Sequence, residues 1–328
     1  MEGLKLMRIG AYCIRPLHCC AGKSRVIRGG SGVLLLYVGL LPPCFALEPE
    51  PRKWQHLPVG TNIAGIGYAH TEADILLDPT FRLEDVGMSL DTLAGKYVHT
   101  FELLDKSARI ELTQAYQDGT WTGVIDGTQK SVSRSGLADT VARFAINLNG
   151  APPLSGKDYA AYRAQVDKET LVGAGLAVRL PTGEYFEDQL VNIGDNRFTF
   201  RPQIGVTHNA GKWTTEVTGE AALFTDNDQY FKGKKLEQDP LYVLHSHLSY
   251  TIRPGFWVGG GLSYETGGEK TVDGVDKNDA KENVAWGLNL AYPLSRHASV
   301  NAKYIGSQTQ KDTGLDSDTF SVGTSLSW

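Results

Sequence analysis

The chain has 328 residues, 41% of them hydrophobic, and a formal net charge of −5 at pH 7. This acidic balance argues against a nucleic-acid partner, because phosphate binding needs basic surface. All four cysteines, Cys13, Cys19, Cys20 and Cys44, lie before residue 45. The rest of the chain therefore offers no disulfide, no cysteine nucleophile and no thiolate metal ligand.

The N-terminal region has the order of a secretory signal, in which basic residues precede an apolar run and then small residues. Six basic residues precede the run 32–41 (GVLLLYVGLL), and Cys44-Phe45-Ala46 follows it. The run is shorter than the roughly 20 residues that a membrane-spanning helix needs. We expect residues 1–46 to be a cleaved signal peptide, with Met7 as an alternative start. A lipoprotein signal at Cys44 is the rival interpretation, which Pro43 disfavours.

Beyond this leader, apolar and polar residues alternate with a period of two, which predicts β-strands. Ala142, Phe144 and Ile146, for example, alternate with Arg143 and Ala145. Such segments lie at about 60–73, 86–101, 106–118, 139–149, 170–181, 197–209, 212–225, 241–252, 256–266, 283–292, 298–307 and 317–328. An even number of alternating segments of this length is typical of bacterial outer-membrane barrels. We therefore expect an all-β fold, a transmembrane antiparallel β-barrel of about 12 strands, formed by residues 47–328 as one domain.

The connections between these segments differ in length on the two sides of the expected barrel. Short links lie at 104–105, 210–211, 253–255 and 293–297, and long ones at 119–138, 182–196, 226–240, 267–282 and 308–316. Outer-membrane barrels have short periplasmic turns and long outer loops, whereas a soluble sandwich would show no such preference. The exception is 150–169, where residues 155–166 predict a short periplasmic helix with Ser155 as its N-cap.

The last expected strand carries a pattern typical of barrel assembly signals. Apolar or small side chains recur at every second position on one face, at Phe320, Val322, Thr324, Leu326 and the terminal Trp328. We expect this strand to engage the barrel-assembly machinery. The other expected partners are outer-membrane lipid and lipopolysaccharide.

Five stretches of the chain are similar to a known family. They read GIGYAHTEADILLDP, YVHTFELLDKSARIELTQAYQDGTWTG, VGAGLAVRLPTGEY, NRFTFRPQIGVTHNAGKW and DPLYVLHSHLSYTIRPGFWVGGG. In these stretches the chain resembles outer-membrane proteins of the MetA-pathway of phenol degradation family. The resemblance implies an outer-membrane channel with a link to uptake of aromatic compounds. It implies no particular binding residues.

Motifs of catalysis and cofactor binding are missing from the sequence. There is no G-x-S-x-G, no H-E-x-x-H, no phosphate loop and no complete dinucleotide fingerprint. We therefore expect no enzyme activity and no cofactor, and an outer-membrane hydrolase is a remote alternative. His245 and His247 have a spacing used by some metal sites, but no third ligand is evident. The acidic loop at 226–239 could hold Ca²⁺ or bridge lipopolysaccharide, and a solvated loop is favoured.

The inward-facing residues must then carry the function. By alternation, the expected lumen-lining residues are Arg109, Glu111, Arg143, Asn147, Arg201, Gln203, Glu216, Glu220, His245 and His247. Twelve strands fall between filled eight-stranded barrels and open porins, so we expect a narrow or partly plugged pore for small solutes, aromatic or hydrophobic compounds among them. The alternative is a structural or surface-binding barrel without transport.

One register can be predicted from a hairpin. Centring the turn between the sixth and seventh strands on Ala210-Gly211 places Ile204 opposite Val217. The same register places Arg201 opposite Glu220 inside the barrel, where their charges would pair.

Overall fold

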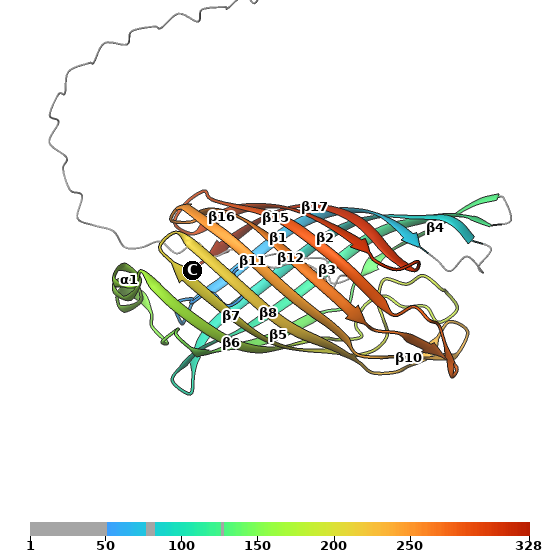
Figure 1. Ribbon diagram of the computed structural model, residues 1–328, viewed down its shortest axis with the longest axis horizontal. Coiled ribbons are helices and arrows are strands. Elements are labelled where there is room, and N and C mark those ends of the chain that lie inside the picture. Colours follow the sequence, from blue (N-terminus) through green and yellow to red (C-terminus); the bar gives the residue numbers. More distant parts are fainter. Residues whose placement is uncertain (1–50, 77–82, 126–127) are drawn as a thin grey trace, which may run out of the picture. The chain divides into compact units, whose positions relative to one another are not determined.

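The computed structural model describes residues 51–76, 83–125 and 128–328 (Figure 1). The expected signal peptide, residues 1–46, lies outside the described residues. Twelve strands form the barrel: β1 (Asn62–Leu76), β2 (Leu83–Leu103), β3 (Lys106–Ile125), β5 (Val141–Asn149), β6 (Lys168–Arg179), β7 (Thr199–Ala210), β8 (Trp213–Phe224), β11 (Leu241–Arg253), β12 (Phe256–Gly267), β15 (Lys281–Pro293), β16 (Ala298–Thr309) and β17 (Gly314–Ser327). Neighbours pair antiparallel, and the pairing of β1 with β17 closes the ring. The expected fold is confirmed.

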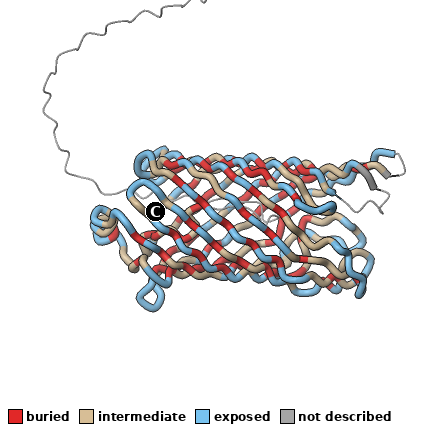
Figure 2. The backbone as a smooth tube through the Cα atoms, in the orientation of Figure 1, coloured by how far each residue is buried: buried red, intermediate tan, exposed pale blue. Residues whose placement is uncertain are grey.

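The barrel wall has an apolar outer face and a polar inner face. Buried and exposed residues alternate along each strand (Figure 2). Outward-pointing Ile66 and Leu288 are 62% and 65% exposed, whereas inward-pointing Glu216 is only 2% exposed. Such a distribution is the reverse of a water-soluble domain and is that of a barrel whose outer face meets lipid. Within the described residues, no helix has the length and apolar character to cross a membrane.

One end of the barrel, here called the short-turn end, carries tight turns. Leu104 and Asp105 both have positive φ, of 51° and 56°, as in the type I′ turns that suit hairpins. Trp328 lies at this end, where its backbone N–H and carbonyl both bond to Asn62. The helix α1 (Gly156–Gln165) also lies here, in the connection between β5 and β6 (Figure 1). Ser155 occupies its N-cap position, but its side chain makes no capping hydrogen bond.

The opposite end, here called the long-loop end, contains further β-structure. β4 (Thr128–Leu137) pairs with the second half of β3, and the two strands form a hairpin that extends beyond the barrel. Four short strands form a separate sheet, namely β9 (Asn227–Tyr230), β10 (Lys234–Gln238), β13 (Lys270–Val272) and β14 (Val275–Asp276). The links expected at 119–138, 226–240 and 267–282 are therefore partly strands. Their residues are mostly polar, so no apolar alternation marks them in the sequence.

The predicted register of the β7–β8 hairpin is wrong by two residues. Val206, rather than Ile204, pairs with Val217. The turn is formed by Gly211 and Lys212, and Gly211 has a φ of 58°. Glycine thus takes the first turn position, where a type II′ turn requires positive φ. A shift by two keeps each side chain on its predicted face of the wall.

The outward apolar face makes a testable prediction. Leu288 lies near the middle of β15, so Leu288→Arg should destabilise the barrel in lipid vesicles by roughly 2–4 kcal/mol, the cost of a cation at the bilayer midplane. Unfolding by guanidinium from those vesicles measures this. Val275 is also well exposed but belongs to the separate sheet, so Val275→Arg should change the stability little. Equal effects of the two substitutions would contradict a lipid-facing β15.

Candidate functional site: the charged inner wall and the segment seated on it

Residues 52–60, here called the lumen segment, lie against the inner wall near the short-turn end. The backbone N–H groups of Lys53 and Trp54 donate to the Glu216 carboxylate, at 3.0 and 3.2 Å. At the other end of the segment, the Gly60 N–H donates to the Thr100 carbonyl of β2 at 2.9 Å. The segment therefore runs from β8 to β2 and occupies part of the lumen.

Two glycines make room for Trp54, which is almost fully buried. Gly173 of β6 and Gly205 of β7 are direct cross-strand partners. A Cβ atom at either position would lie 2.1 or 2.0 Å from indole atoms of Trp54, so only glycine fits. The indole N–H donates to the Thr218 hydroxyl of β8 at 2.8 Å, and the Arg143 guanidinium lies over the ring. These contacts fix Trp54 on the wall formed by β6, β7 and β8.

The rest of the lumen segment is held by the connection that contains α1. Burial lowers the pKa of His56, so its ring is neutral, and its Nε2–H donates to the Pro152 carbonyl at 2.7 Å. The Tyr159 hydroxyl of α1 donates to the His56 carbonyl at 2.9 Å. Leu57 packs on Ile63 and Val98 of the inner wall. The helix expected at 155–166 is present as α1, and its contacts help to hold this segment in place.

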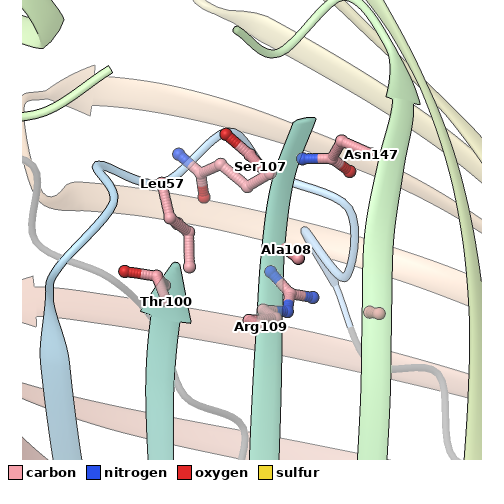
Figure 3. Close-up of a pocket in the computed structure, with 8 residues that line it drawn as sticks. Leu57, Thr100, Ser107, Ala108, Arg109 and Asn147 are labelled. Atoms are coloured by element: carbon pink, nitrogen blue, oxygen red, sulfur yellow. The ribbon is translucent and has the colours of Figure 1, made fainter. Parts of the chain in front are cut away.

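The packing between segment and wall leaves little space. Figure 3 shows a hollow bordered by Leu57, Thr100, Ser107, Arg109 and Asn147. Its volume is about 10 Å³, which is roughly enough for one water molecule. Between the lumen segment and the wall formed by β2, β3 and β5, this hollow has no room for a larger solute.

Charged side chains line the inner wall beside Trp54, and Glu111 of β3 is one centre of this network. The Glu111 carboxylate accepts from Lys96 Nζ and from Arg109 Nε, both at 2.8 Å, and also pairs with Arg143. Glu111 and Arg143 are both less than a tenth exposed. Arg109 also donates to the Lys53 carbonyl, which ties the network to the lumen segment.

The network continues through Gln203 to a second carboxylate, Glu220 of β8. Arg143 Nε donates to Gln203 Oε1 at 2.9 Å, and Gln203 Nε2 donates to Glu220 at 2.7 Å. Arg201 Nε donates to Glu220 Oε1 at 3.0 Å, and Lys53 Nζ lies 3.7 Å from Glu220. The Arg201–Glu220 contact is present as predicted, although Gln203 rather than Arg201 stands directly opposite Glu220.

Cations outnumber carboxylates in this network, even when Glu216, which anchors the lumen segment, is counted with it. Five basic side chains (Lys53, Lys96, Arg109, Arg143 and Arg201) accompany three carboxylates (Glu111, Glu216 and Glu220), an excess of two positive charges. In a narrow pore with walls of low dielectric, such an excess raises the local concentration of anions.

The structure brings together most, but not all, of the predicted lumen residues. Asn147 faces inward at the small hollow, which Arg109 of the charged network also lines, but it takes no part in the hydrogen bonds described above. His245 and His247 are buried on the inner face of β11, where His245 shares a hydrogen bond of 2.6 Å with Ser263. Among the described residues, no three His, Cys, Asp or Glu side chains are grouped to hold a metal ion. In the acidic loop, Lys235 bridges Asp226 and Glu237.

Two features of the lumen were not predicted from the sequence. The lumen segment reads RKWQHLPVG and has no alternation that would predict a strand. Its one indication of a structural role is Trp54, a large apolar side chain between the expected leader and the first strand. The second feature is an apolar cluster on the inner wall towards the long-loop end. Buried Ala73, Met88 and Leu90 form it, and the partly buried Trp121 and Leu315 pack against them. Met88 is the cross-strand partner of both Ala73 and Trp121.

The fold and inner wall define the chain as a membrane β-barrel of twelve strands with a segment seated in its lumen. Residues 78–322 match the family described as "Putative MetA-pathway of phenol degradation", and the chain belongs to this family. Among solved structures it is similar to the COG4313 outer membrane channel from Pseudomonas putida F1, with 20% identity and a TM-score of 0.69 over 86% of this chain and 100% of that one. No curated protein matches the chain.

More distant similarity extends to two other barrels. The β domain of the Bordetella autotransporter BrkA has 10% identity and a TM-score of 0.45, covering 82% of this chain and 100% of that one. The KdgM porin has 10% identity and a TM-score of 0.40, covering 80% and 99%. At these levels the comparisons carry no argument about function.

The glycine seat of Trp54 makes a second prediction. Gly205→Ala places a Cβ atom where the indole lies and should displace Trp54, which releases the Lys53 and Trp54 N–H groups from Glu216. Hydrogen–deuterium exchange of a peptide covering residues 52–57 should then become faster. Gly219→Ala on the neighbouring strand is the matched control, because a Cβ atom there meets nothing within 4 Å. Unchanged exchange in Gly205→Ala would show that the seat is not needed.

The Arg201–Glu220 contact makes a third prediction. Glu220 is buried, and Arg201 lies closer to it than Lys53 does, so removing Arg201 weakens the compensation of a buried charge. Breaking a buried ion pair typically costs about 3–5 kcal/mol, and the double alanine variant should lose less than the sum of the two single variants. Urea unfolding of the single and double variants measures the coupling. Arg201→Ala combined with Glu72→Ala serves as the control cycle, because Glu72 is exposed on the outer face of β1. Strict additivity for Arg201 and Glu220 would contradict the pair.

Proposed function

We propose that this protein is a channel of the bacterial outer membrane for small solutes, with its short-turn end in the periplasm. The observation that carries the proposal is the inner wall, where buried charges line a closed barrel instead of an apolar core. Short turns on one side and long loops on the other support the orientation. The proposed role is not enzymatic.

The preferred solute, in this proposal, is an aromatic or hydrophobic compound that carries a negative charge. The apolar cluster around Met88 and Trp121 offers a surface for a ring at the long-loop end. The network around Glu111 and Glu220 offers an excess of cations further along the wall. The family description, which names phenol degradation, is consistent with aromatic solutes.

The lumen segment sets the width of the proposed pore. Trp54 and Leu57 fill space next to the inner wall, so the pore at rest is narrow. The same feature favours one alternative, a closed barrel that acts as an envelope scaffold or surface-binding protein. The two functions differ in whether the barrel conducts.

Planar-bilayer recording tests the proposal. Refolded protein that begins at Leu47 should form small channels, and Trp54→Ala should conduct several-fold more, because the indole no longer fills the lumen. Trp213→Ala is the matched control, since Trp213 is half exposed on the outer face of β8. In a KCl gradient the reversal potential should show anion preference. Absence of conductance in every variant would support the scaffold instead, and cation preference would overturn the proposed solute class.

A further inference from the structure

A second hollow, of about 370 Å³, opens at the short-turn end outside the charged network. Its lining comes from four elements: the lumen segment, α1, the β7–β8 turn and the β11–β12 turn. Each element contributes a basic side chain, respectively Arg52, Arg163, Lys212 and Arg253. No Asp or Glu is among the lining residues, and the volume is within the range of small-molecule sites.

Arg52 is fixed in this hollow by neutral partners. Its guanidinium donates to the Ser249 hydroxyl at 3.1 Å and to the Thr251 hydroxyl at 2.8 Å, and it lies over the Trp257 ring. Burial lowers the pKa of Arg52 to about 10, and the group remains charged at neutral pH. The guanidinium is therefore held rigidly with its charge uncompensated by an adjacent carboxylate.

Lys212 and Arg253 also contact neutral groups, although both side chains are exposed. Lys212 lies over the Tyr250 ring, and Arg253 lies over the Tyr292 ring and donates to its hydroxyl at 2.9 Å. Aromatic faces and hydroxyls orient a cation without neutralising it. Three of the four cations thus meet only neutral groups in their contacts within the described residues.

Two of the carboxylates near the hollow are engaged by other groups. Glu169 pairs with Arg163 and also accepts from Asn209 at 3.0 Å. Glu216 attracts Arg52 at longer range, but its oxygens accept the backbone N–H groups of Lys53 and Trp54. A third carboxylate, Asp167, has Oδ1 3.7 Å from the place of a Cβ atom at Gly211, which lines the hollow. When all three carboxylates are counted, the four cations leave an excess of one positive charge.

We propose that this hollow is a binding site for an oxyanion, the carboxylate or phosphate group of a small molecule or of a lipid headgroup. Guanidinium groups present paired N–H donors that match the geometry of such a group. Because the fold already places the four basic residues around one hollow, little free energy is spent on bringing them together when an anion binds. Anion binding at this site does not require the barrel to conduct, so its test is independent of the test of the proposed channel.

Two sources could supply the oxyanion. A small organic anion that approaches from the side of the lumen would meet Arg52 first, because Arg52 belongs to the lumen segment. A lipid headgroup would meet Lys212 and Arg253, which are exposed and lie beside the outward aromatic pairs Trp213–Tyr250 and Phe256–Tyr292. The same donors serve both sources, and the experiment below separates them.

Isothermal titration of the barrel in neutral detergent tests the site, with benzoate and inorganic phosphate as probes and benzamide as the uncharged control. Benzoate or phosphate should bind, and benzamide should not. The variant with Lys212→Gln and Arg253→Gln should lose roughly tenfold in affinity, the effect of losing charge-assisted contacts. Lys212 lies in the β7–β8 turn and Arg253 is the last residue of β11, and both are exposed, so folding should be preserved. Heat-modifiable migration on gel electrophoresis checks this. Arg296→Gln is the matched control, an exposed basic residue at the same end that does not line the hollow.

Nanodiscs distinguish the two sources. If a headgroup is the ligand, benzoate should bind more weakly in phosphatidylglycerol nanodiscs than in phosphatidylcholine nanodiscs, because the anionic headgroup competes for the site. Native mass spectrometry should then detect phosphatidylglycerol bound to the wild type but not to the double variant. If a free solute is the ligand, benzoate should bind equally in both lipids. The proposal is overturned if benzoate, phosphate and phosphatidylglycerol all bind the double variant as well as they bind Arg296→Gln.

Discussion

Closure of the barrel is the constraint on which the rest of the structure depends. In hydrocarbon every backbone N–H and carbonyl must find its partner within the chain, because no water is available. The pairing of β1 with β17 meets this demand, and Trp328 completes it by bonding to Asn62. Once the ring is closed, alternate side chains must face lipid or lumen. The chain therefore segregates apolar residues outward and collects its charges inside.

The inner charges are stable only as a connected set. Glu111 and Glu220 are separated by several strands, yet Arg143 and Gln203 link them through unbroken hydrogen bonds. Each carboxylate has more than one cationic neighbour, so burial does not leave it unpaired. Lys53 belongs to this set, which couples the position of the lumen segment to the electrostatics of the wall.

The sequence predicted what the membrane itself dictates. Strand number and the inner and outer faces follow from alternation, because a side chain on the wrong face is costly. The Arg201–Glu220 contact was predicted from the hairpin register, and it is kept although that register is wrong by two, because both side chains face the lumen and Arg201 reaches Glu220 diagonally. The error of two residues in the β7–β8 register could not be detected from alternation, because a shift by two leaves every side chain on the same face of the wall. Trp54 could not be placed, because its partners Gly173, Gly205 and Thr218 are more than a hundred residues away in sequence and show no pattern that names an indole.

The seat of Trp54 has a consequence for the order of assembly. The lumen segment precedes β1 in the chain, but Trp54 rests on a wall made by β6, β7 and β8. Contacts between residues so distant in sequence form late, because a long loop must close before they contribute. The residues synthesised first within the barrel domain thus cannot take their final place until β6, β7 and β8 have formed.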